Sequence, residues 1–300
     1  MIRGLALSLS VCLVFVASMA SGLSFNVSYE DQANATGIGF DDPLLGAVRR
    51  GTLEAALGVV SSSVQMPSTI DLAILASEVD GTGFLAGAGP YYFIDAPGYQ
   101  NGLPYLHAAF GVDLDPALPD AEIQFDFGYS WNSDLDQPTG SEFDLMSVAL
   151  HEIMHTLGFA SLLQHDGQSP FGANTYGFYD SFLQRGDGTP LFGSGATFLG
   201  SAADLVSNDI FFSGENASSA NGGDPVQIYA PSIFSPGSSL SHVNKPGEVT
   251  SYSFSPGDSR RAYSSVELGV LADLGWNVVP EPTTVVLLGL GLAGLAARRR

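Results

Sequence analysis

Cysteine and basic residues are scarce in this sequence. The single cysteine, Cys12, lies in the apolar segment at the N-terminus, so the rest of the chain has no thiol with which to form a disulfide. Lys and Arg number 10 against 31 Asp and Glu, a formal net charge of −21, and four of the ten basic residues (Arg3 and residues 298–300) lie near the ends. Because phosphate binding requires a basic surface, this charge argues against nucleic acid as a partner.

Both ends of the chain have the composition of sorting segments. Residues 1–20 combine a basic start, an apolar run and small residues at positions 18 and 20, which predicts a cleaved signal peptide and an exported protein. Residues 279–300 contain Pro-Glu-Pro at residues 280–282, then a short apolar run and three terminal arginines. A basic end after an apolar run would hold that end on the cytoplasmic side of a membrane.

This tail resembles the PEP-CTERM sorting signal. The resemblance covers about the last 22 residues and includes all three parts of the signal. It implies a Gram-negative-type bacterium, an exosortase as processing partner, and an extracellular or cell-surface protein. Before processing, the C-terminal segment would lie in the inner membrane. A simple C-terminal membrane anchor is the alternative.

Residues 147–159 contain the strongest functional signal in the chain, a His-Glu-x-x-His sequence at residues 151–155. On an α-helix, positions i and i+4 share a face, so His151 and His155 can direct their imidazoles at one zinc ion. Glu152, about 100° further round the helix, would accept a proton from a water held by the metal. This arrangement is typical of a zinc hydrolase; the alternative is a chance match on an ordinary core helix.

The surrounding residues predict a buried helix. Ser141 and Asp144 form a capping-box-like start, and Gly158 supplies a C-terminal stop. Two histidines and a glutamate inside a buried helix cost free energy unless something binds them. The helix surface between these ends is otherwise apolar, at positions 145, 146, 148, 150, 153 and 157.

Hydrophobic periodicity predicts further elements in the first half of the chain. Residues 24–29 and 70–74 alternate as strands, and a helix should begin at Asp42-Pro43. Residues 80–105 indicate a loop with a short strand near 91–94. The predicted apolar face of the helix consists of Leu45, Val48, Ala56 and Val59.

Residues 121–129 have the clearest strand pattern in the sequence, with apolar and polar residues in strict alternation. In zinc proteases an edge strand beside the cleft pairs with the extended substrate backbone. The sequence leaves open whether this strand lies at the edge or inside the sheet. His107, in the preceding segment, has no partner histidine nearby and is expected to be structural.

After Gly158 the composition changes to Gly, Ser, Asn, Pro and Asp. Residues 164–246 are expected to be loop-rich and packed around the metal site, because long structureless stretches are uncommon in a compact domain. Residues 267–274 should form a short helix. No internal repeat is visible. The predicted organisation is therefore one domain over residues 21–278, with an upper half to about 160 and a lower half beyond it.

A catalytic zinc ion takes three protein ligands, so one more is needed. In the compact metzincin pattern the third histidine follows the first by ten residues, and that position is Ser161. On chemistry alone His165, Asp180 and His242 all remain candidates.

Four ordered blocks resemble leishmanolysin-type metzincins and their bacterial secreted relatives: residues 151–159, 237–242, 248–252 and 271–276. The resemblance implies that His242, in its Ser-His context, is the third zinc ligand. It further implies an α+β zincin fold: a mixed twisted sheet lies over an active-site helix, and a cleft separates this upper half from a loop-rich lower subdomain. The function implied is zinc-dependent endopeptidase activity on protein or peptide substrates.

One block departs from the family pattern. Such proteins carry a methionine turn beneath the zinc, and this chain has Thr250 where that methionine stands. Tyr252 is present and could stabilise an oxyanion or simply pack. A catalytically silent matrix or adhesion protein that retains the zinc-protease fold is the competing hypothesis. Glu152 discriminates between the two, since a structural zinc site needs no base there.

Calcium is a weaker expectation. Two acidic loops, at residues 113–115 and 134–136, could hold it, although neither matches a complete calcium-loop signature. Solubility is the simpler role for their charge.

Overall fold

The computed structural model describes residues 22–30, 35–77, 81 and 83–279. The predicted signal peptide, and all of the predicted sorting tail except its first residue, therefore lie outside the described residues. The described part of the chain contains no helix with the length and apolar content needed to cross a bilayer.

The main sheet has four strands in the order β1 (Ser24–Tyr29), β2 (Thr69–Ser77), β5 (Ala121–Asp126) and β3 (Ala86–Pro90). The first three run parallel, and β3 is antiparallel to β5. The alternating strand predicted at 121–129 is confirmed but ends at Asp126 and lies inside the sheet. Its neighbour β3 forms the edge.

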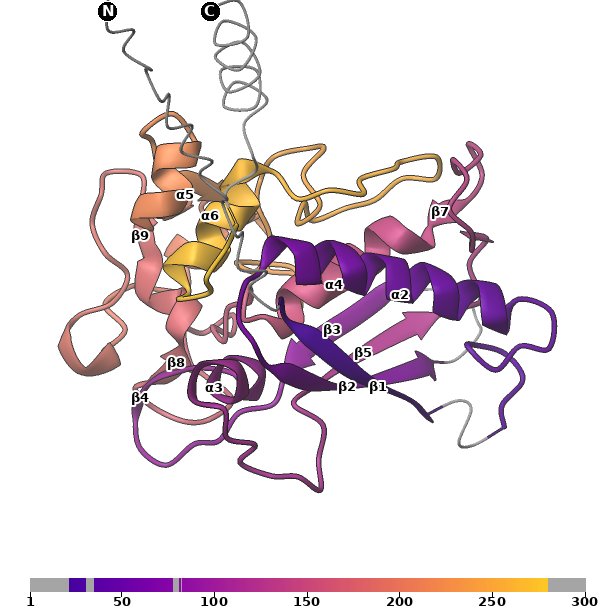
Figure 1. The fold of residues 1–300 in the computed structure, drawn as a ribbon. Helices are drawn as coiled ribbons and strands as arrows, with labels where there is room; N and C mark the ends of the chain where they lie inside the picture. The colour runs from indigo at the N-terminus through magenta and orange to yellow at the C-terminus, as the bar shows by residue number, and fades with distance from the viewer. Residues whose placement is uncertain (1–21, 31–34, 78–80, 82, 280–300) are drawn as a thin grey trace, which may run out of the picture.

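Two helices, α2 (Gly46–Ser63) and α4 (Leu145–Thr156), lie side by side across one face of this sheet (Figure 1). The alternating residues of β2 and β5 that face them, among them Ile74 and Phe125, are fully buried. Burial of such apolar side chains is the main favourable term in folding. The core of the upper half therefore lies between the sheet and the two helices.

The predicted start of α2 was wrong, and its predicted face was right at Ala56, which is fully buried, but wrong at Leu45 and Val48. Asp42 Oδ1 accepts the amides of Leu44 and Leu45 in a turn, and the helix begins only at Gly46. Leu45 and Val48 are 43% and 42% exposed. Arg49 occupies the buried face instead, because its guanidinium donates to backbone carbonyls of residues 38 and 39 and covers the ring of Phe127.

Residues 80–105 are more regular than the sequence suggested. They contain β3, β4 (Gly98–Gln100) and the start of α3 (Leu103–Phe110), while Tyr92 forms only an isolated bridge, so the strand predicted near 91–94 is wrong. The sequence of β3, Ala-Gly-Ala-Gly-Pro, has low strand propensity. It is a strand because β5 supplies its hydrogen-bonding partner.

The lower half is built from short elements, as its composition predicted. A three-stranded antiparallel sheet has the order β11-β10-β9, β8 extends β4 in parallel, and α5 packs on α6. The bounds of these and the remaining strands and helices are Trp131–Asn132 (β6), Phe143–Asp144 (β7), Thr175–Gly177 (β8), Leu183–Arg185 (β9), Ile210–Phe212 (β10), Glu215–Ala220 (α5), Val226–Ile228 (β11) and Ser265–Asp273 (α6), with 3₁₀ turns at Phe178–Phe182, Ser194–Ala196 and Asp204–Val206.

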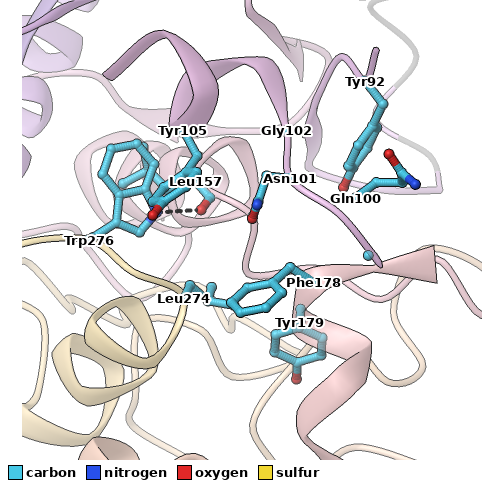
Figure 2. A pocket seen from close by; sticks show the side chains of 12 residues that line it. Tyr92, Gln100, Asn101, Gly102, Tyr105, Leu157, Phe178, Tyr179, Leu274 and Trp276 are labelled. Carbon is cyan, nitrogen blue, oxygen red and sulfur yellow. Dashed lines mark hydrogen bonds between the residues drawn. The ribbon is translucent and has the colours of Figure 1, made fainter. Parts of the chain in front are cut away.

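Helix α6 begins two residues before its predicted start, capped by a reciprocal Ser264 and Glu267 pair. Just beyond its end, Trp276 Nε1 donates to the carbonyl of Leu157, so the ends of α6 and α4 are joined. Figure 2 shows Trp276 beside Tyr105 and Leu157 at a small cavity of about 10 Å³, room for about one water.

Candidate metal centre

Helix α4 is fixed at its N-terminus by a buried carboxylate. The N-cap is Asp144 rather than Ser141, because Asp144 Oδ2 accepts both the amide and the hydroxyl of Ser147. Arg261, from far along the chain, donates to both Asp144 oxygens at 2.8 and 2.6 Å. A bidentate pair of this kind sets orientation as well as charge balance. Gly158, with φ of 93°, ends the helix as predicted.

Three imidazole nitrogens meet at one point beneath this helix. The Nε2 atoms of His151 and His155 are 3.1 Å apart, and the Nε2 atom of His242 lies 3.0 Å from the first and 3.3 Å from the second. Zinc bonded to nitrogen at about 2.0–2.1 Å in a tetrahedron sets its ligands roughly 3.3 Å apart. The spacing of the triad thus fits one zinc-sized ion.

The opposite nitrogen of each ring is bonded to a backbone carbonyl. His151 Nδ1 lies 2.7 Å from the oxygen of Val249, His155 Nδ1 lies 2.6 Å from that of Phe159, and His242 Nδ1 lies 2.7 Å from that of Ser238. A carbonyl can only accept, so each Nδ1 carries the proton and each Nε2 presents a lone pair. Three lone pairs facing one another repel unless a cation lies between them, which is the donor set of a metal site.

Burial keeps the triad neutral. The three rings are 5–6% exposed. Burial lowers the pKa of His242 to about 3 and also lowers the pKa of His155, and for His151 the neighbouring imidazoles add to the effect of burial. Neutral imidazole is the form that binds metal.

Glu152 lies beside the triad without a counter-charge. Its side chain is 4% exposed, and among the described residues its Oε2 atom has no hydrogen-bond partner. Burial raises the pKa of Glu152 to about 8. Burying a carboxyl group with an unpartnered oxygen costs free energy of folding, and a nearby cation would lower its pKa by attracting the ionised form.

The triad and Glu152 line a cleft of about 820 Å³ between the two halves of the domain. The upper wall is β3 with the residues just before it, and the lower wall comes from residues 235–238 and 251–254. Among the described residues that line the cleft, Glu152 has the only Asp, Glu, Lys or Arg side chain, in a chain of net charge −21.

The rival ligands lie elsewhere. His165 is exposed and contacts the ring of Phe234. Asp180 is fully buried but accepts hydrogen bonds from the Ser161 hydroxyl and from the amides of Leu162 and Gly177. Neither belongs to a close cluster of potential ligands in the described chain.

His107 lies in a separate cluster. Its Nδ1 pairs with Asp120 Oδ2 at 2.9 Å, and the same oxygen accepts the amide of Asp71. This carboxylate already has two donors.

The two acidic loops contribute no side chain to either cluster. In the loop at 134–136, the guanidinium of Arg261 donates to the carbonyls of Leu135 and Asp136, so a cationic side chain already occupies these oxygens. In the loop at 113–115, Asp113 accepts the amide of Asp115.

Comparison with protein families matches residues 278–300 to the PEP-CTERM protein-sorting motif. The C-terminus carries this sorting signal. Exosortases recognise the motif, which directs proteins to the cell envelope or surface of Gram-negative bacteria, so the predicted sorting partner and exported destination are supported. Comparison with curated proteins gives no match.

Tyr252 lines the cleft and is 39% exposed. Its ring stacks on Tyr229 with centroids 3.9 Å apart and planes at 6°. A packing role is therefore visible, and the oxyanion role stays a prediction.

Sequence reasoning missed the groups that orient the histidines. The carbonyls of Val249, Phe159 and Ser238 are backbone atoms, which leave no residue-type signal. Glu267, whose carboxylate holds the turn beneath His151, could have been found, because Ser264 and Glu267 have capping-box spacing in the sequence.

Proposed function

We propose that this chain is an exported zinc-dependent endopeptidase of leishmanolysin-like, metzincin type. One observation carries the proposal: three Nε2 lone pairs converge next to a buried carboxyl group whose Oε2 atom has no hydrogen-bond partner among the described residues, on the wall of an open cleft. His151, His155 and His242 would hold the zinc, and Glu152 would be the general base.

When bound, zinc supplies Lewis acidity, which lowers the pKa of a bound water to about 7 and polarises a carbonyl oxygen. The chain's own groups do the rest. The three backbone carbonyls keep the imidazoles in the ligand tautomer. The positive charge of an ion held by the three neutral histidines would lower the pKa of Glu152. The ionised Glu152 could then accept a proton at Oε2 and return it to the leaving amine.

The edge strand β3 is the element we assign to substrate binding. It lines the cleft along its length, and no strand of the described residues pairs with its outer edge, where an extended peptide could bind. The strand singled out by the sequence, β5, is covered on both sides by β2 and β3 and cannot serve in this way.

The fold proposed is a zincin, with α4 as active-site helix. Support comes from the mixed sheet above α4, the short elements below it, and the contribution of His242 from the lower half.

The test is metal analysis of the purified chain together with a casein-digestion assay. We expect about one zinc per chain, digestion that phenanthroline abolishes, and a Glu152→Ala variant that keeps zinc but loses on the order of a hundredfold in activity or more. The alternative, a silent matrix or adhesion protein, predicts zinc without digestion in the parent. Equal rates for the parent and the alanine variant would show that the assigned mechanism is wrong.

A further inference from the structure

The turn at residues 248–251 contacts the metal centre in two ways. The carbonyl of Val249 accepts the Nδ1 proton of His151 at 2.7 Å. The carbonyl of Thr250 accepts the amide of Val243, the residue next to His242, at 3.1 Å. Two ligands that are 91 residues apart thus depend on the position of one short turn.

Thr250 is tied to a buried carboxylate by two bonds. Its amide donates to Glu267 Oε1 at 2.6 Å, and its hydroxyl donates to the same oxygen at 2.9 Å. The other oxygen, Oε2, accepts the amide of Ser264 at 2.8 Å. Both Thr250 and Glu267 are fully buried, so these bonds do not compete with water.

The helix that carries Glu267 is itself held in place. Asp273, at the end of α6, accepts the amides of Asn216 and Ala217 at the start of α5. The two helices also pack closely, since a Cβ added at Gly269 would lie 2.7 Å from the Cα of Ala217. Glu267 therefore projects from a rigid element toward the turn.

We infer that Glu267, acting through Thr250, is a positioning residue of the metal centre: it fixes the turn whose carbonyls orient His151 and the backbone beside His242. This inference rests on the proposed metal site. It also gives Thr250 a role at the place where the resembling proteins have methionine. A threonine hydroxyl can donate to the carboxylate, whereas an apolar side chain of the same shape cannot.

The experiment compares zinc affinity among variants of the full chain, measured by competition with a zinc chelator, and the visible spectrum of bound Co²⁺ as a report on ligand geometry. Thr250→Val keeps the shape and removes the hydroxyl; Thr250→Ser keeps the hydroxyl. Because loss of a group that orients a metal ligand costs about 10- to 100-fold in metal affinity, we expect a loss of about tenfold in Thr250→Val and Glu267→Gln, with an altered Co²⁺ spectrum. Thr250→Ser should stay within about twofold of the parent.

Thr52→Val is the matched control. Thr52 is equally buried, and its hydroxyl donates to the carbonyl of Ser133 at 2.9 Å, away from the triad. This variant should lose comparable thermal stability and keep parental zinc affinity, which separates positioning from general loss of stability.

Parental zinc affinity and Co²⁺ spectrum in both Thr250→Val and Glu267→Gln would overturn the inference, as would an equal loss in Thr52→Val. If Thr250→Val does not fold, the decision rests on Glu267→Gln against Thr250→Ser: loss in the first with retention in the second supports the inference, and retention in both overturns it. A parent chain that binds neither Zn²⁺ nor Co²⁺ would instead remove the proposed metal centre, and this inference with it.

Discussion

Each histidine of the triad has its protonation state set by two neighbours of different kinds. A backbone carbonyl holds the proton on Nδ1, which leaves the lone pair on Nε2, directed at the Nε2 atoms of the other two rings. Burial then makes the charged form of the ring expensive. The ligand form of the triad is therefore built into the fold before any metal arrives, so little reorganisation is needed on binding.

His242 is the residue on which this site most depends, because it brings in a segment 87 residues beyond His155. We expect His242→Ala to leave two ligands and to reduce zinc far below one per chain, measured by metal analysis after dialysis. His165→Ala, at an exposed histidine outside the triad, is the control and should retain parental zinc. Full zinc and activity in His242→Ala would exclude it as a ligand.

Proton uptake by His242 should be visible in the stability of the metal-free chain. The pKa of its ring is about 6.5 in an unfolded chain and about 3 in the folded one, so below pH 6.5 the unfolded state binds the extra proton. The stabilisation is complete above pH 6.5 and is lost as the pH falls toward 3. Between pH 7 and 5 this amounts to about 2 kcal/mol.

The measurement is urea unfolding of the parent and of His242→Gln in a chelator, at pH 7 and pH 5. The parent should lose about 2 kcal/mol more than the variant over this interval. The comparison is needed because other groups also contribute: burial lowers the pKa of His151 and of His155, so they act with the same sign as His242. Glu152 has the opposite sign, because its pKa is raised to about 8 and its contribution falls as the pH rises. Equal losses in the two proteins would contradict the burial of a neutral His242.

Among the elements, those with strong local patterns could be predicted and those created by pairing could not. Helix α4 and strands β1 and β2 follow from periodicity and are present. β3 could not be predicted, since its alanines and glycines have no strand pattern and only the free edge of β5 makes it a strand. Part of the buried face of α2 was missed for a related reason: Arg49 is buried but looks like a surface residue in the sequence.

β3 offers a direct test of substrate pairing. The carbonyl of Leu85 accepts the amide of Asp126 in β5, and the amide of Tyr91 donates to the carbonyl of Asp120, the residue before β5. Backbone groups of successive strand residues point to opposite sides, so those of Ala86 and Ala88 point away from β5, toward the cleft. Ala88→Pro removes an amide on the substrate side only. We expect unchanged zinc content and melting temperature with a loss of about fivefold to tenfold in kcat/KM on peptides, the worth of about one hydrogen bond.

The matched variant is Gly89→Pro, which removes an amide on the β5 side. It should lower the melting temperature, because a bond of the sheet is lost. If Ala88→Pro cleaves peptides at the parental rate, β3 is not the strand that binds substrate.

On the scale of the whole molecule, the site is assembled from segments that share no local signal. The third ligand, the turn at 248–251 and Glu267 come from three parts of the lower half, and Arg261 pairs with Asp144, the N-cap of α4. From the residues alone, His242 could not be separated from His165 or Asp180. Resemblance to a family pattern selected it, and the fold brings its Nε2 to the other two.

The end of the domain can be located from its contacts. Residues 277–279 bond to the end of α2: Gln65 donates to the carbonyl of Asn277 at 2.7 Å, and Val279 donates to that of Ser63 at 2.9 Å. Val278 forms a bridge with Val64. The sequence placed the boundary at 278, and these bonds extend the folded unit to Val279.

A chain that ends at Val279 should therefore be soluble and keep the full melting temperature, whereas one that ends at Trp276 should lose about 2–3 kcal/mol from broken backbone bonds. For a domain of this size that is a fall of roughly 5–10 °C, measurable by circular dichroism. Equal melting of the two truncated chains would place the boundary before residue 277. Aggregation of the chain ending at Val279, with the full chain soluble, would instead show that the tail contributes to the folded state.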